Sequence, residues 1–548
     1  MRRFGNTKNT FDVSRRGLLR GAAASAAISA GSATMMAGKA RAQVASGGHP
    51  VLGDNPVKRA SDAFKIKVNS ARRYLEQRLA APATNGDEGL YADKRGSFSK
   101  CLVHNDLGEV DAASYASLLT ALGSGDPADF DAIQMTDTGT RSRGLVNPQA
   151  AYQFPDAGPD GQGTRIRPAP TFAGDETAGE MQEVYWKALF RDVPFIKFDV
   201  NGQIPRAIAD MNAAPFVVGN PVAGQHTLQT IFRGETAGDR TGPYVSQFLW
   251  KPVPYGNGTM EQRYPVPPIG GDYMTEFGEW LTVQRGGVVG TDARQGNVYI
   301  HNGRSLAEYV HYDFSYQAYL NAALIILGFG PDFFDTDNPM LGNGTQEGFS
   351  TFGGPDVLDM VACAANQALS GAWYQKWLIN RRARPEVYGG RLHLQQTGEK
   401  DYGLPSFLTD TLALERVKRR KGSYLLPMAY AEGSPTHPAY PAGHACMAGA
   451  CATVLKAYFN EDALVPAPVE SNATGTVLRD YAGDLTIGGE INKLANNISL
   501  GRDWAGVHYR SDGIEGMNLG EQMAIDMLQD HSAIYNERFS GFNLTKFD

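Results

Sequence analysis

A run of small residues after a proline-rich turn constrains the fold of this chain more than any other stretch. Residues 434–443 carry Pro438 and Pro441, which keep the backbone extended, and residues 445–452 are almost all Ala, Gly and Cys. This run predicts a tightly buried helix whose free N–H groups and positive dipole end face the turn. His437 and His444 bracket the turn. The stretch therefore indicates an anion site beside a titratable group, although two histidines that merely cap a core helix remain an alternative.

Helical patterns dominate the rest of the chain. Residues 130–172 form a loop rich in Asp, Gly, Thr and Pro, and residues 215–268 indicate a hairpin with long excursions, including a β-type run at 244–250. The apolar run 322–327 shares its helix with Asp313 and is therefore a core helix, not a membrane span. The predicted helices are 60–79, 180–190, 274–283, 306–327, 356–382, 408–419, 444–459, 487–498 and 516–528.

The first 42 residues have the three features of an export signal. A twin-arginine pattern, Arg15-Arg16, precedes the short apolar run 22–37 and a signal-peptidase-like site that ends at Ala42. We expect twin-arginine export, cleavage after Ala42 and a periplasmic or secreted protein; a basic leader that stays in the cytosol is the alternative. Residues 43–548 contain no low-complexity linker or fixed-period repeat and are expected to form a single large helical unit.

Charge and cysteine content exclude several classes of function. The leader holds eight of the 51 basic residues and one of the 58 acidic ones, so the remainder carries a formal net charge of −14, which disfavours nucleic-acid binding. There is no CxxC, HExxH or zinc-type cluster, so any metal must be held in an unusual way. Four cysteines are too few for a disulfide scaffold. Cys446 and Cys451 are expected to be buried thiols, and a disulfide between Cys101 and Cys363 is an undecided alternative.

Two further segments supply cations and a carboxylate. On a helix, Lys376 and Arg384 would lie about 80° apart around the axis and about 12 Å apart along it, and Pro385 would end the helix. The alternative is a solvated basic face, which suits Arg381 and Arg382. Further on, the chain has Arg502, then His508, then Asp512. These provide an oxyanion donor, a nucleophilic or ligating imidazole and a carboxylate that can orient it.

Together the three segments resemble the signature of the vanadium-dependent haloperoxidases and the related type 2 phosphatidic acid phosphatases. The spacing of seven residues between Lys376 and Arg384, with His437 seven residues before His444, is most similar to the algal bromoperoxidase branch. The resemblance covers most of the mature chain. The expected fold is mainly α and consists of helical bundles, namely two packed four-helix bundles, with long loops and a few short β-hairpins. The oxyanion site is expected at about 360–530.

The resemblance also implies a role for each site residue. His508 would bind vanadium, and Asp512 would support His508. His444 would be the acid/base group. Vanadate oxygens would be neutralised by Lys376, Arg384, Arg502 and the backbone N–H of Gly443, whereas Trp373 and His437 would line the halide approach, His437 being typical of bromoperoxidases.

The implied activity is oxidation of bromide and iodide by hydrogen peroxide to a hypohalous-acid-type agent that halogenates small organic acceptors. The cofactor would be one vanadate per subunit, and a homo-oligomer is expected. An acid phosphatase with His508 as nucleophile is the alternative, and a silent oxyanion-binding protein is a third. Ala442 departs from the family serine, so a hydroxyl donor is missing. Structural calcium could bind Asp332, Asp335 and Asp337, unless these loop acids are simply solvated.

Overall fold

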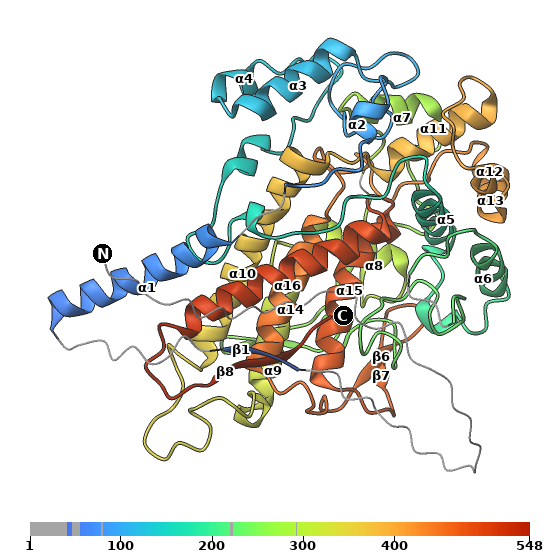
Figure 1. The fold of residues 1–548 in the computed structure, drawn as a ribbon. Coiled ribbons are helices and arrows are strands. Elements are labelled where there is room, and N and C mark those ends of the chain that lie inside the picture. Colours follow the sequence, from blue (N-terminus) through green and yellow to red (C-terminus); the bar gives the residue numbers. More distant parts are fainter. Residues whose placement is uncertain (1–40, 46–54, 78–80, 220–222, 292, 548) are drawn as a thin grey trace, which may run out of the picture. The chain divides into compact units, whose positions relative to one another are not determined.

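Four long helices pack around one another and carry the centre of the fold (Figure 1). They are α10 (Gly354–Tyr374), α14 (Gly443–Tyr458), α15 (Ile487–Ala505) and α16 (Arg510–Ser532). A Cβ added at Gly520 would lie 1.9 Å from the carbonyl oxygen of Cys446, and one at Gly449 would lie 2.1 Å from that of Met517. The small residues of α14 therefore allow α14 and α16 to approach within backbone contact, as the predicted buried helix requires.

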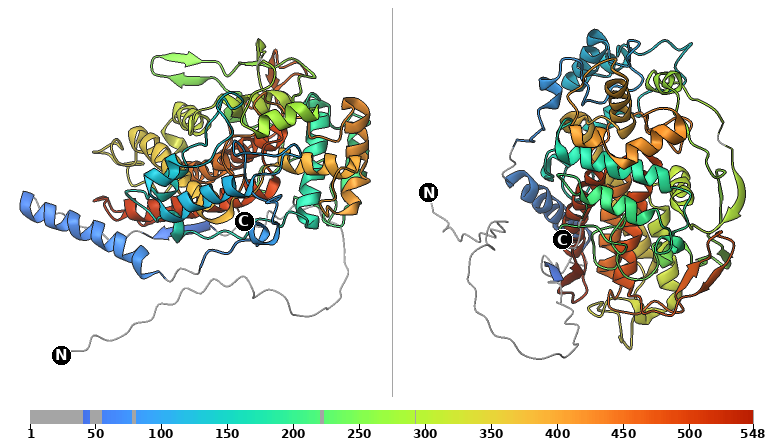
Figure 2. Two further views of the ribbon diagram at one scale, coloured as in Figure 1. Left: turned by 90° about the horizontal axis from the view of Figure 1, so that it is seen from above. Right: turned by 90° about the vertical axis from the view of Figure 1, so that its right-hand side faces the viewer.

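The computed structural model describes residues 41–45, 55–77, 81–219, 223–291 and 293–547. The remaining helices mostly lie around the central four (Figures 1 and 2). In chain order these are α1 (Pro56–Glu76), α2 (Asp87–Leu90), α3 (Ala112–Ser124), α4 (Pro127–Asp131), α5 (Asp175–Phe190), α6 (Ile204–Asn212), α7 (Phe277–Gln284), α8 (Gly303–Tyr312), α9 (Gln317–Phe329), α11 (Pro385–Thr397), α12 (Ser406–Thr409) and α13 (Leu412–Lys421). Short 3-10 turns occur in the long loops, among them η1 (Pro148–Tyr152) and η3 (Phe195–Lys197).

The strands are short and pair only two by two among the described residues. All four pairs are antiparallel: β1 (Arg41–Ala45) with β8 (Gly541–Thr545), β2 (Val253–Tyr255) with β3 (Gly258–Met260), β4 (Tyr264–Val266) with β5 (Gln295–Val298), and β6 (Val469–Ser471) with β7 (Leu478–Asp480). The predicted mainly helical fold with a few short strand pairs is confirmed.

Several predicted elements were wrong in detail. The predicted helix 306–327 is two helices, because α8 ends at Tyr312 and α9 begins at Gln317. The predicted β-type run 244–250 contains instead a 3-10 turn at Gln247–Leu249. Two predicted helices were too short, since α15 continues to Ala505 and α16 begins at Arg510.

The backbone around Lys376 and Arg384 also differs from its prediction. The α-helix stops at Tyr374 and continues as a π-helical segment, Gln375–Asn380, after which Arg381 adopts a left-handed conformation with φ 39°. Arg384 is the extended N-cap residue of α11, so Pro385 begins a helix and does not simply end one. The predicted continuous helix through Arg384 is therefore wrong.

Two hydrophobic clusters hold this region in place. The large cluster spans the central helices, and a smaller one forms where α3 packs on the π segment. Trp377 of that segment belongs to the smaller cluster and meets the ring of Phe98 edge-on, with ring centroids 5.5 Å apart. The chain before residue 152 thus stabilises the backbone that carries Lys376.

Residues 41–548 form one compact unit. Residues 1–40 of the predicted leader lie outside the described residues, and the predicted cleavage point after Ala42 lies inside β1. No helix in the described part of the chain is long and apolar enough to cross a membrane.

The structure also bears on the predictions for the cysteines and for the acidic loop residues. All four cysteines are free, so the Cys101–Cys363 bridge is not formed, and Cys446 and Cys451 are buried as predicted. No group of three or more His, Cys, Asp or Glu side chains among the described residues could hold a metal ion, and the three candidate calcium ligands do not make one.

Candidate active site

The N-terminus of α14 faces the proline-rich turn and has no side-chain cap. Ala442 is its N-cap residue, is fully buried, and donates its backbone N–H to the carbonyl oxygen of Asp512 at 2.8 Å. A methyl group cannot accept from the first-turn N–H groups, which lack intrahelical partners. This uncapped helix start has the geometry of an anion site, and anion binding there stays a prediction.

Lys376 lies on the π segment and is completely buried. Its ammonium donates to the carbonyl oxygens of Pro438 at 2.7 Å and Ala439 at 2.9 Å, both in the turn before α14. Burial, and then the neighbouring Arg384 guanidinium, hold the pKa of Lys376 well below its ordinary value. Two carbonyl dipoles position this cation without neutralising it.

Arg384 is the most highly connected cation of the site. Its Nε and Nη2 donate to the carbonyl oxygen of His437, and its Nη1 donates to the carbonyl oxygen of Val507 and to Nε2 of His508, both at 2.8 Å. The side chain is fully buried, and burial lowers the pKa of Arg384 to about 9. Its contacts thus join the turn before α14 to the imidazole of His508.

Arg502, on α15, completes a group of three cations that we call the cationic cluster (Lys376, Arg384, Arg502). Its Nη1 donates to the carbonyl oxygen of Val310 at 2.5 Å, and its guanidinium carbon lies 5.6 Å from the centre of the Tyr430 ring. The Nε of Arg502 is buried and has no hydrogen-bond partner among the described residues. A buried N–H without an acceptor is costly, so this donor fits an oxyanion that the protein itself does not provide.

His508 is oriented by Asp512. Nδ1–H of the imidazole donates to Oδ2 of Asp512 at 2.8 Å, which leaves Nε2 as the acceptor nitrogen that points to Arg384. The backbone N–H of Tyr509 donates to the same carboxylate oxygen at 3.1 Å. Burial, followed by the charges of Arg384 and Lys376, keeps the pKa of His508 well below its ordinary value. A neutral imidazole whose Nε2 carries a lone pair and no proton is suited to binding a metal.

Arg382 holds Asp512 from the other side, a role that the sequence analysis missed. Its Nη1 donates to Oδ1 of Asp512 at 2.8 Å and its Nη2 to Oε2 of Glu180 at 2.9 Å, with 4% of the residue exposed. Arg381 pairs with Glu88. The predicted solvation of Arg381 and Arg382 was therefore wrong. A usable signal was Glu180 itself, an acid between apolar residues of a buried helix, which requires a cationic partner.

The charges do not balance inside the site. The three cations are buried, and the carboxylate that acts electrostatically on both Lys376 and Arg384, Asp512, already accepts from Arg382. Each member of the cationic cluster bears electrostatically on His508. Excess buried positive charge of this kind requires an anion, and an uncapped helix N-terminus lies in the same place.

His444 has a partner on α8. Its Nε2 lies 2.9 Å from Oδ1 of Asp313, the C-cap residue of α8, and a quarter of the His444 side chain is exposed. The sequence prediction did not include Asp313 among the site residues. Its position directly after a predicted helical turn carries no local signal, because only the tertiary fold brings α8 to the start of α14.

Trp373 and His437 lie against each other, as expected for residues that line one approach. Their ring centroids are 4.8 Å apart at an interplanar angle of 41°. A Cβ placed on Gly443 would contact the Trp373 ring at 3.5 Å, so the ring reaches the start of α14. Burial, with the charges of Lys376 and Arg384, holds the pKa of His437 well below its ordinary value. The structure thus connects all nine predicted site residues around one helix N-terminus.

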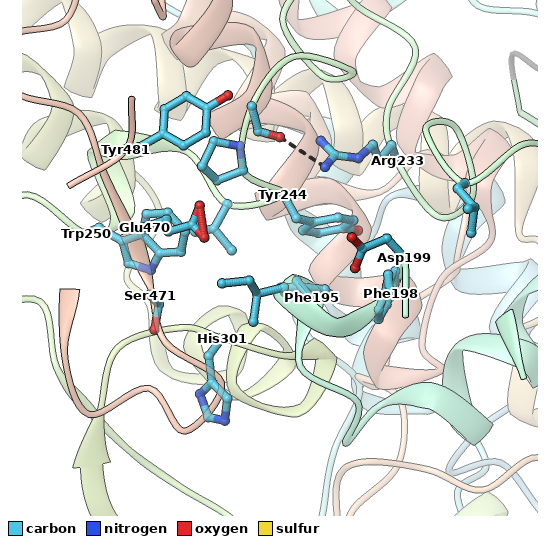
Figure 3. A pocket seen from close by; sticks show the side chains of 15 residues that line it. Phe195, Phe198, Asp199, Arg233, Tyr244, Trp250, His301, Glu470, Ser471 and Tyr481 are labelled. Carbon is cyan, nitrogen blue, oxygen red and sulfur yellow. Dashed lines mark hydrogen bonds between the residues drawn. The ribbon is translucent and has the colours of Figure 1, made fainter. Parts of the chain in front are cut away.

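A separate cavity of about 340 Å³ lies outside this site (Figure 3). Its walls include Phe195, Phe198 and Tyr244, and none of the predicted site residues lines it. The same three rings pack on Trp504, two residues beyond Arg502, and Trp504 Nε1 donates to the Tyr244 hydroxyl at 3.0 Å. The cavity wall therefore supports the end of α15.

Comparisons with known proteins agree with this geometry. Residues 357–537 match the family model described as the VCPO second helical-bundle domain. The vanadium-dependent bromoperoxidase of Ascophyllum nodosum is 36% identical over 509 residues, which cover 88% of this chain and 90% of that protein. The vanadium-dependent bromoperoxidase of Corallina officinalis is 34% identical over 595 residues, covering 90% and 98% respectively.

A solved structure extends the similarity to the fold. The second vanadate-dependent bromoperoxidase of Ascophyllum nodosum, described as homohexameric, superposes with a TM-score of 0.83 at 31% sequence identity and covers 88% of both chains. Sequence and structure comparisons therefore agree over most of the chain, and the expected family is confirmed. This chain belongs to the family of the vanadium-dependent bromoperoxidases.

Proposed function

We propose that this protein is a vanadium-dependent haloperoxidase that oxidises bromide and iodide with hydrogen peroxide to a hypohalous-acid-type halogenating agent. The observation that carries the proposal is the cationic cluster, buried around an imidazole whose Nε2 is the acceptor nitrogen. Three relatives named vanadium-dependent bromoperoxidase support the same assignment.

The residues present fit vanadate. The orphaned Nε of Arg502 offers a donor, the uncapped start of α14 offers the N–H of Gly443, and Lys376 and Arg384 supply two further cations. Nε2 of His508 would be the direct ligand. Bound vanadate supplies a Lewis acid that activates peroxide toward halide without a change in oxidation state.

The protein's own groups have separable tasks. Asp512 fixes the tautomer of His508, and the cationic cluster neutralises the oxyanion charge. Because Nε2–H of His444 donates to Asp313, Nδ1 is the nitrogen of His444 that can accept and return a proton. Trp373 and His437 form the wall along which halide approaches.

The first test combines activity with halide choice. Protein treated with orthovanadate and given hydrogen peroxide, halide and an organic acceptor is expected to oxidise bromide and iodide efficiently. Chloride should react at least about ten-fold more slowly near neutral pH, a barrier difference of about 1.4 kcal/mol. The control is protein stripped of vanadate with a chelator, which should be inactive.

Two outcomes would oppose these assignments. Comparable turnover of chloride would contradict the bromide and iodide preference. Hydrolysis of a phosphate monoester without halide oxidation would instead identify the acid phosphatase, since both chemistries use an oxyanion site with a nucleophilic or ligating histidine.

Ala442 offers a second prediction. In Ala442→Ser, the hydroxyl would lie at the N-cap of α14 beside the predicted oxyanion site, where the alanine makes no side-chain hydrogen bond. One added hydrogen bond to a charged acceptor is expected to tighten vanadate binding about ten-fold, equivalent to about 1.4 kcal/mol. Titration of vanadate-free protein measures the change.

The control for this variant is Ala442→Gly, which changes the same position without adding a donor and should not tighten binding. Unchanged or weaker binding in Ala442→Ser would show that another donor already replaces the family serine and that the hydroxyl only crowds a fully buried position.

Assembly and export complete the proposed function. We infer a homo-oligomer from the homohexameric relative. We also propose twin-arginine export to the periplasm or the exterior, with the leader removed after Ala42, on the strength of the Arg15-Arg16 pattern and the site at 40–42. N-terminal sequencing of the exported protein should begin at Gln43, and retention of residues 1–42 would reject the cleavage site.

A further inference from the structure

Helix α1 is attached to the rest of the described protein mainly through its last turn. None of its 21 residues is buried. Figures 1 and 2 show it, in blue, extending away from the neighbouring helices. Most helices depend on packing of one face for their stability, because helix propensity alone leaves an isolated helix of this size marginal in water. Helix α1, about 32 Å long, therefore has no fully buried face among the described residues.

The exposed side of α1 carries an apolar stripe. At 100° per residue the stripe falls within about 60° of arc around the helix axis. Its exposed members are Val57, Ala60, Phe64, Ala71 and Leu75, and the partly buried Val68 lies at its edge. The large side chains among them are 80% exposed at Val57, 68% at Phe64 and 85% at Leu75. Contiguous exposed apolar side chains of this size mark interaction surfaces.

The attachment of α1 to the body leaves this stripe uncovered. The Tyr74 hydroxyl donates to the carbonyl oxygen of Asp526 at 3.2 Å and to Oδ2 of Asp530 at 2.9 Å. Nη2 of Arg73 donates to Oδ1 of Asp530 at 2.7 Å. These contacts to α16 are made from the last turn of α1, where Arg73 lies opposite the stripe and Tyr74 lies beside it, so they leave most of the stripe uncovered.

The helix is basic although the chain is acidic. Helix α1 carries six Lys or Arg and two acidic residues, a net of +4, against −7 for the whole chain, so the rest of the chain carries −11. Three of its cations directly follow stripe residues at the same seven-residue spacing: Lys58, Lys65 and Arg72. A partner that offers an apolar surface with acidic residues beside it would complement this face.

We propose that the apolar stripe of α1 binds the body of a second copy of this chain. The proposal rests on the inferred homo-oligomer. The chain outside α1 has a net charge of −11, and the relative with TM-score 0.83 is described as homohexameric. Burying Val57, Phe64 and Leu75 in such an interface removes three large apolar side chains from water, which favours assembly.

Sedimentation velocity of the full protein tests this assignment. Phe64→Glu/Leu75→Glu is expected to reduce the mass of the main species at least about two-fold, because charge cannot enter an apolar contact without a partner. The matched control is Asn69→Glu/Gln77→Glu, which adds the same charge to exposed positions outside the stripe and should keep the wild-type mass. Thermal unfolding should show both variants folded, since α1 contributes no buried residue.

The outcomes distinguish a failure of the α1 interface from a failure of the proposed homo-oligomer. A monomeric wild type would reject the homo-oligomer itself. An assembled wild type with an equally assembled stripe variant would reject the role of α1 and leave the oligomer standing. Co-sedimentation of wild type with phosphatidylglycerol vesicles, lost in the stripe variant while its assembly is unchanged, would assign the stripe to a membrane surface and overturn the proposal.

Discussion

Replacing His508 with alanine is expected to abolish vanadate retention and lower halide oxidation at least about 100-fold, since losing a supporting residue alone already costs 10–100-fold in comparable sites. His508 is the imidazole that Asp512 orients and that Arg384 meets at Nε2. No other described histidine accepts from a member of the cationic cluster and donates to a carboxylate at the same time. The variant keeps the cations but loses the ligand.

Vanadium content after gel filtration and bromide oxidation are the two measurements. The fold should survive, because Arg382 still holds Asp512 and the cationic cluster keeps its bonds to backbone carbonyls. His531→Ala is the control, as His531 lies at the far end of α16 and should leave both readouts unchanged. Normal vanadium retention by His508→Ala would remove His508 from the proposed role.

The parts of the site that the sequence predicted well are those encoded by local pattern. The small residues after His444 predict a buried helix, and the structure places α14 against α16 at backbone contact distance. His508 and Asp512 flank Tyr509, the N-cap residue of α16, so their hydrogen bond of 2.8 Å is made within one short segment at a helix start. These features need no knowledge of distant segments.

The Lys376–Arg384 segment could not be predicted in the same way. Its backbone after the π segment is fixed by segments that are distant in the sequence. The backbone N–H of Phe98 donates to the carbonyl oxygen of Arg381, and the backbone N–H of Ala383 donates to that of Gly96. Ala439 donates to the carbonyl oxygen of Arg382 at 3.0 Å. Helical periodicity carries no information about such long-range bonds, so an ideal helix was the wrong expectation.

The break between α8 and α9 has the same cause. Residues 313–316 contain neither glycine nor proline, and the apolar pattern runs through them. The chain leaves the helix at Asp313, whose carboxylate meets His444. The interruption therefore lies at a site residue, where tertiary contacts override local propensity.

Arg382→Met is expected to lower the free energy of unfolding by about 3–5 kcal/mol at neutral pH, the usual effect of removing one partner of a buried ion pair. Arg382 lies between Asp512 and Glu180 and also donates to the Ser511 hydroxyl at 2.9 Å. Methionine fills much of the volume, but it leaves two buried carboxylates without their cation. Thermal and denaturant unfolding of wild type and variant provide the measurement.

The decrease in the free energy of unfolding caused by Arg382→Met should depend on pH in a defined direction. Burial already raises the pKa of Glu180 in the native protein, although the Arg382 guanidinium opposes this. Without Arg382, the pKa of Glu180 in the folded state rises further above its unfolded value, so the folded state binds more protons than the unfolded state. The destabilisation should therefore be larger at pH 8 than at pH 5. Equal losses at both pH values would show that packing, and not the uncompensated charge, is responsible.

The neighbouring arginine provides the control for this variant. Arg381 pairs with Glu88, whose side chain is 27% exposed, so Arg381→Met should cost less than about 2 kcal/mol because solvent screens the remaining carboxylate.

Arg382→Met should also weaken vanadate binding in the fraction that stays folded, since Asp512 loses one of the two groups that set its orientation and His508 loses its alignment. A variant that is destabilised but binds vanadate normally would limit Arg382 to a structural role.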